Sequence, residues 1–170
     1  MPTIFDTAKY FLETLGQMTT MKLQKLCYYA QAWTLAWNET ELFPEDFEAW
    51  TEGPVCQKLF QTHKGDYVIN KDSLPEGDTK AFSETQLKNL ERVRKQYGNK
   101  DAKTLSDQTH SEDPWKSARI GLSENERGNI VITKDSMRLY YGNFLPDEEA
   151  KIISDRIMAK FEKCYRALAQ

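Results

Sequence analysis

Hydrophobic residues recur with a helical period over much of the chain, beginning near the amino terminus. From Ile4 to Leu15 the apolar positions fall 3 or 4 residues apart, which places them on one face of a helix. Thr3 and Asp6 resemble a capping box at the start of this helix, with the aspartate in place of the usual Glu or Gln. Gly16 suits the residue that follows its end. We therefore predict a first helix over residues 4–15.

The next helix, predicted from about residue 20 to Asn38, is apolar on almost every side. A helix without a clear polar face belongs at the centre of a core. Gln24 and Gln31 lie 7 residues apart and project on one side of it. If both amides are buried, each needs hydrogen-bond partners, because an unpaired buried polar group costs about 1–3 kcal/mol.

The rest of the pattern predicts six more helices and a short β element. Pro54 is expected to open one helix and Asp113 to cap another. The predicted helices cover residues 55–63, 83–98, 102–109, 113–121, 133–141 and from 147 to about 168, with extended residues near 47–51 and 130–132. The fold class is mainly α: a compact single-domain helical bundle of about eight helices around a central apolar helix, with a small β element. One domain is expected over residues 1–170.

Composition and charge narrow the classes of function. The formal net charge is −3, which argues against a general nucleic-acid binder with a basic face. No apolar run approaches the ~20 residues of a membrane span, and no signal peptide is visible, so we expect a cytoplasmic protein without a membrane partner. The three cysteines form no CxxC pair, and we predict neither a metal site nor a cofactor.

Catalytic patterns are also missing from the sequence. It contains no phosphate-binding glycine loop, no HExxH and no GxSxG. His110 could act as a general base with Glu112 or Asp113, or it could only fix the turn before Trp115. Cys27 lies among apolar residues, which raise a thiol pKa and make a nucleophile less reactive. We predict that the chain is not an enzyme, and a hydrolase with a site at His110 remains an alternative.

The most acidic stretch runs from Glu39 to Glu52 and holds six carboxylates without a lysine or arginine. Such a run is commonly a solvated face. It could instead dock a basic partner by electrostatic complementarity, with Phe43 and Pro44 as an exposed apolar anchor. The partner-binding residues predicted on this basis are Glu41, Phe43, Glu45 and Asp46.

A family resemblance follows from four blocks of sequence that occur in order between about residues 5 and 141. The segment KLQKLCYYAQAW at 22–33 resembles the signature helix of the Panacea domain, formerly known as a phage-associated domain of unknown function. LFP at 42–44, EAW at 48–50 and GPV at 53–55 resemble the second block. Leu105–Ser106, Thr109–His110 and Pro114–Trp115 resemble the third, and Ile132 with Tyr140–Tyr141 the fourth.

The resemblance implies a mainly helical fold with a small β element and an antitoxin that binds a cognate toxin encoded alongside it. It implies no catalytic residue and no cofactor. An adaptor that delivers a bound partner to a protease is the main alternative to direct neutralisation. Two departures, at Cys27 and at Thr51–Glu52, are local and could affect partner choice. By default we interpret the motif residues as scaffold: Lys22, Gln24, Lys25, Tyr28, Gln31, Trp33, Trp50, Gly53, Pro54, His110, Pro114 and Trp115.

Overall fold

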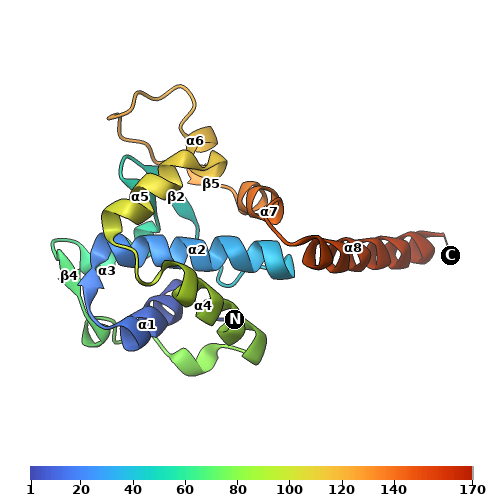
Figure 1. The fold of residues 1–170 in the computed structure, drawn as a ribbon, viewed down its shortest axis with the longest axis horizontal. Coiled ribbons are helices and arrows are strands. Elements are labelled where there is room, and N and C mark those ends of the chain that lie inside the picture. Colours follow the sequence, from blue (N-terminus) through green and yellow to red (C-terminus); the bar gives the residue numbers. More distant parts are fainter. Residues whose placement is uncertain (170) are drawn as a thin grey trace.

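The computed structural model describes residues 1–169, and helices dominate it (Figure 1). The predicted mainly helical fold with a small β element is confirmed for this part of the chain. Its α-helices are α1 (Ile4–Leu15), α2 (Thr20–Asn38), α3 (Gln57–His63), α4 (Glu84–Tyr97), α5 (Ala102–Ser111), α6 (Asp113–Ala118), α7 (Lys134–Gly142) and α8 (Asp147–Leu168). Its strands are β1 (Met18–Thr19), β2 (Phe47–Trp50), β3 (Gly53–Val55), β4 (Val68–Ile69) and β5 (Val131–Ile132), and short 3-10 turns cover Lys71–Ser73 and Thr79–Ala81.

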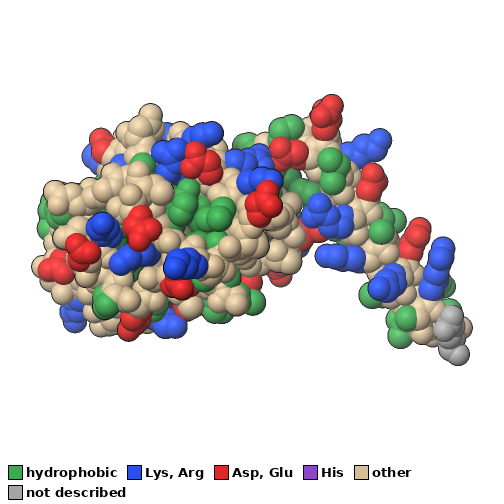
Figure 2. All heavy atoms as spheres, turned by 90° about the horizontal axis from the view of Figure 1, so that it is seen from below, with side chains coloured by type: hydrophobic (Ala, Val, Ile, Leu, Met, Phe, Trp, Pro, Cys, Tyr) green, Lys and Arg blue, Asp and Glu red, His purple; other side chains and the backbone are tan. Residues whose placement is uncertain are grey.

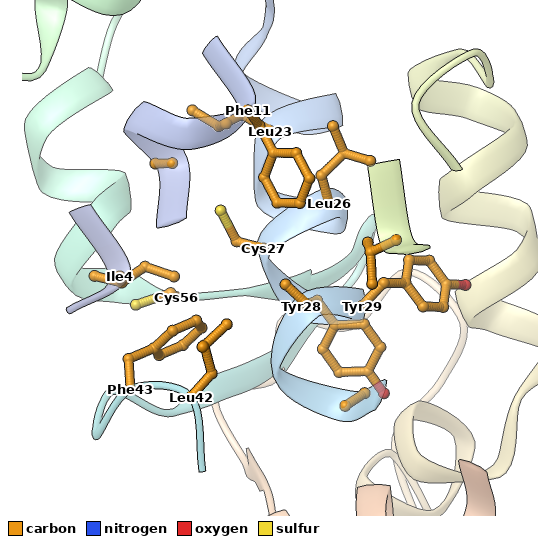
Figure 3. Close-up of a cluster of buried hydrophobic side chains, with 14 of the residues drawn as sticks. Ile4, Phe11, Leu23, Leu26, Cys27, Tyr28, Tyr29, Leu42, Phe43 and Cys56 are labelled. Carbon is orange, nitrogen blue, oxygen red and sulfur yellow. The ribbon is translucent and has the colours of Figure 1, made fainter. Parts of the chain in front are cut away.

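Helix α2 is the centre of the core, as its apolar sequence predicts. It packs against α1, α4, α5 and α7, and its residues from Leu23 to Trp37 are all buried. Figure 3 shows side chains of α1, of α2 and of the segment before β2 meeting around Cys27. Trp33 stacks on Trp37 with ring centroids 5.3 Å apart, so aromatic packing continues to the end of the helix.

A three-stranded antiparallel sheet in the order β3-β2-β5 covers one side of α2, and β1 pairs separately with β4. Ala49 pairs with Pro54, and Phe47 pairs with Ile132. The prediction that Pro54 opens a helix is therefore wrong, because Pro54 lies in β3 and the helix begins at Gln57. Since β3 is an edge strand, a proline without an N–H is tolerated there.

The helix starts follow the sequence signals in most cases. Capping boxes form at Thr3 with Asp6 and at Ser83 with Gln86, as predicted. Asp113 is not a cap, because α6 begins at Asp113 itself and its N-cap position is Glu112. The Glu112 side chain makes no capping bond, and its carboxylate accepts hydrogen bonds from tyrosines instead.

Helix α8 leaves the body of the molecule as an arm (Figure 2). None of its residues from Asp147 to Leu168 is buried, although its sequence has an apolar side. The apolar positions predicted for this helix therefore do not enter the core.

Candidate functional site

The two glutamines of α2 hold the ends of the segment that carries the β2–β3 hairpin. Gln31 Nε2 donates to the carbonyl of Phe43 at 2.7 Å, and its Oε1 accepts from the N–H of Leu42 at 2.7 Å. Gln24 Oε1 accepts from the N–H of Cys56 at 2.9 Å, and its Nε2 donates to the Cys56 carbonyl at 3.3 Å. Both buried amides thus find the partners that burial requires.

Lys25 is buried between α2 and the hairpin. Its Nζ donates to the carbonyl of Pro54 at 3.0 Å. Burial lowers the pKa of Lys25 to about 7, against an opposing effect of Glu52. Gly53 has a φ of +105°, and a Cβ at this position would lie 2.6 Å from Lys25 Cε and 2.8 Å from Thr109 Oγ1. Only glycine fits beside this lysine.

The motif residues of α5 and α6 join this layer through two tryptophans. His110 stacks on Trp115 with ring centroids 4.1 Å apart. Trp115 Nε1 donates to the carbonyl of Trp50 at 2.9 Å, and Trp50 Nε1 donates to the Glu48 carboxylate at 2.7 Å. Pro114 is buried in the first turn of α6. The predicted third block therefore packs on the second.

The remaining α2 motif residues also lie against neighbouring helices. Lys22 Nζ donates to the carbonyl of Gly98 at 2.7 Å. Trp33 Nε1 donates to the hydroxyl of Tyr97 at 2.8 Å. Tyr28 is fully buried and meets Phe47 edge to face.

Glu112, which the sequence suggested only as a partner of His110, is a buried carboxyl group with a structural role. Tyr29 donates its O–H to this carboxylate at 3.1 Å, Tyr141 donates a second hydrogen bond, and Gln108 a third at 3.2 Å. Burial raises the pKa of Glu112, and these donors partly oppose the effect. The three donors use the lone pairs of Glu112, so the carboxyl joins α2, α5 and α7.

The chemistry around His110 gives little support to a catalytic pair. Burial lowers the pKa of the imidazole, and the charge of Lys25 lowers it further. Across residues 1–169 neither Glu112 nor Asp113 is hydrogen-bonded to His110, and its Nε2 is buried without a partner. No group of three or more potential metal-ligating side chains occurs within those residues.

The acidic stretch is less open than its sequence suggests. Lys134 Nζ lies 2.7 Å from the Glu41 carboxylate and 3.2 Å from that of Asp46. Glu45 pairs with Lys58 at 2.8 Å and also accepts from the N–H of Ile4 at 3.1 Å. These three acids therefore have counter-charges, which are supplied by lysines outside the acidic stretch.

Phe43 does not form the exposed anchor that the sequence predicted. Its side chain is fully buried in the core, where it points inward beside Leu42 (Figure 3). Its carbonyl accepts from Gln31, and this hydrogen bond fixes the segment to α2. The prediction of an exposed side chain is therefore wrong for Phe43, whereas Pro44, the other residue of the predicted anchor, is exposed.

An open cleft of about 480 Å³ lies beside the hairpin. It combines two carboxylates with one guanidinium and an aromatic ring, and its lining residues are Glu48, Trp50, Thr51, Glu52, Val55, Gln57, Arg127, Gly128 and Asn129. Arg119 connects β2 to the loop that precedes Arg127. Its guanidinium donates to the carbonyls of Ala49 at 2.9 Å and Glu126 at 2.6 Å. Two acids of the acidic stretch, Glu48 and Glu52, thus face this cleft together with Arg127.

Comparison with models of protein families identifies the family to which the chain belongs. The family model described as "Antitoxin SocA-like, Panacea domain" matches residues 23–116. The chain belongs to the Panacea domain family. No curated protein and no solved structure matches it.

The match begins within α2, so Lys22 lies just outside it. It covers the rest of α2, the hairpin, and α3 to α5, with the start of α6. The cleft is formed mainly by residues inside the Panacea match, and only Arg127, Gly128 and Asn129 lie outside it. Helices α7 and α8 also lie outside it. None of the helices within residues 1–169 has the length and hydropathy that a bilayer crossing requires.

Proposed function

We propose that this Panacea domain is a cytoplasmic antitoxin that neutralises a cognate toxin by direct protein–protein contact. The observation that carries the proposal is the antitoxin-family match over residues 23–116. The side chains of the motif residues are engaged in buried hydrogen bonds and stacking within the fold, which leaves them to hold the structure together. We propose that they act as scaffold, without a catalytic residue and without a cofactor.

The surface proposed for a basic part of the toxin is the cleft and its acidic edge. Glu52 is exposed there, and Glu48 is half-buried beside it. Glu41 and Asp46 do not line the cleft and both pair with Lys134, but they stay in the proposed surface because their side chains are 32% and 55% exposed. Glu45 is left out of this surface because its side chain is only 8% exposed and supports α1.

Growth rescue tests the proposed function. The chain is expressed in cells together with the toxin encoded by the adjoining gene, and we expect growth to be restored. His110→Ala should also restore growth, because the stack on Trp115 is structural. If folded His110→Ala protein binds the toxin normally but fails to protect the cells, the chain acts as an enzyme and the proposal fails.

A charge reversal tests the proposed surface by the affinity of the purified chain for the toxin at low and high salt. Glu52→Lys should weaken toxin affinity, more so at low salt, because rim charges act mainly through long-range electrostatics. Asp66→Lys makes the same charge change at an exposed residue outside the cleft and serves as the matched control. Equal affinities of the two variants at both salt concentrations would remove the cleft from the interface.

A further inference from the structure

Helix α8 carries an apolar face that nothing in the described chain covers. Its contacts with the body involve its first half, where Glu149 meets Arg92 at 3.2 Å. The carboxy-terminal part of the helix extends away from the other elements (Figures 1 and 2). We call residues 156–169 the free half of α8.

The free half has one apolar stripe. Met158, Phe161, Tyr165 and Leu168 are spaced 3, 4 and 3 residues apart, so they line one face of the helix. Their side chains are exposed, with Phe161 at 65% and Tyr165 at 68%. Contiguous apolar surface of this kind on a folded protein marks an interaction site.

The stripe continues into a cavity where α8 meets the body of the molecule. This cavity has a volume of about 270 Å³ and lies between the end of α2, α7 and α8. Ile157 and Met158 line it together with Leu139 and Leu145. A partner that covers the stripe can therefore also place an apolar side chain between α7 and α8.

The charges of the free half indicate the chemistry of that partner. Four basic residues and one acid give it a net charge of +3: Arg156, Lys160, Lys163 and Arg166 against Glu162. Pairing of two copies would bring two such charges together. Two convex helices would also touch along a single stripe, whereas a stable interface buries about 800 Å² on each partner. A groove with carboxylates at its rim encloses the helix and neutralises its flanks.

We propose that the free half of α8 docks in an apolar groove with an acidic rim on the toxin. This is the helix-in-groove mode of recognition, with Phe161 and Tyr165 as central anchors. The assignment rests on the proposed antitoxin function. It adds a contact surface outside the Panacea match and distinct from the acidic cleft, so variants of the two surfaces can be tested separately.

The test uses the full chain and the purified toxin encoded by the adjoining gene. Wild-type binding and neutralisation are measured first, and they decide the proposed function. The double variant Phe161→Gln with Tyr165→Gln should then lose toxin affinity by on the order of 100-fold, as expected for loss of two aromatic anchors. Ile152→Gln is the matched control, because Ile152 is 58% exposed on a different face of the same helix. Its affinity should equal that of the wild type.

Cys164 provides a second readout without any substitution. It lies beside the stripe and is exposed, whereas Cys27 and Cys56 are buried. Alkylation of the native chain by iodoacetamide should therefore modify Cys164, and bound toxin should slow the reaction strongly. Toxin affinity should also fall as salt is raised, because the flanks are basic and the groove rim is acidic.

Four results would overturn the assignment. A double variant that binds toxin like the wild type removes α8 from the interface while the proposed function stands. Sedimentation of the wild-type chain as a dimer that the double variant abolishes would assign the stripe to a second copy. Flotation of the wild type, but not of the double variant, with phosphatidylserine–phosphatidylcholine vesicles would assign it to a membrane surface. A wild-type chain that does not bind the toxin refutes both proposals.

Discussion

Lys25 is a motif residue whose hydrogen bond stabilises the fold, while burial of its charge destabilises it. The side chain is 1% exposed, and its ammonium meets the Pro54 carbonyl. Water is excluded from the group, so its charged form is disfavoured and its pKa falls to about 7. A neutral lysine at this position keeps the hydrogen bond to the hairpin without the cost of a buried charge.

Stability should therefore increase with pH above neutrality. Between a folded pKa of about 7 and an unfolded value of 10.5, the unfolded chain binds a proton that the folded chain does not. The free energy of unfolding should rise by about 2 kcal/mol from pH 7 to pH 9. Urea denaturation at the two pH values measures the change. Lys25→Met should remove the rise, and the same pH dependence in Lys25→Met and the wild type would show that Lys25 does not titrate in the fold over this interval.

At the scale of elements, the α2 amides attach the hairpin to the central helix. Gln24 and Gln31 each exchange two hydrogen bonds with backbone groups, one pair near each end of the hairpin segment. Their spacing of 7 residues, two turns of helix, sets the separation of those ends. The sequence predicted that both amides need partners, but it could not identify which backbone groups would supply them.

Loss of one of these attachments should be costly. Gln31→Leu preserves the size of the side chain but leaves the Leu42 N–H and the Phe43 carbonyl unpaired in the core. We expect the free energy of unfolding to fall by at least about 2 kcal/mol, measured by urea denaturation. Gln96→Leu changes an exposed glutamine of α4 and should have an effect of less than about 0.5 kcal/mol. Similar losses for both variants would mean that the amide contacts contribute nothing specific.

Local sequence signals predict the start of a helix well where neighbouring residues alone determine it. Thr3 and Ser83 cap helices as expected, because a capping box needs only residues that are close in sequence. Pro54 was predicted wrongly, since its place is set by pairing with Ala49 in the sheet. A proline that suits the start of a helix also suits an edge strand, and the sequence alone does not separate the two.

At the scale of the whole molecule, the candidate site depends on contacts that the linear sequence does not contain. The acids at Glu41 and Asp46 face Lys134, about 90 positions away in the chain. Periodicity predicted the apolar side of α8, but a periodic pattern does not say which surface covers that side. The family motif was found from the sequence because its residues recur in order, whereas the cleft and the arm required the fold.

If this chain neutralises its toxin by direct contact, titration of the two purified proteins should reproduce the inhibition. Toxin activity is measured while the chain is added in a reaction without protease or nucleotide. Toxin activity should fall in proportion to the added chain and reach its minimum at a fixed molar ratio. Full toxin activity until a protease is supplied would refute direct neutralisation and identify an adaptor, and inhibition by a small fraction of the molar amount would identify an enzyme.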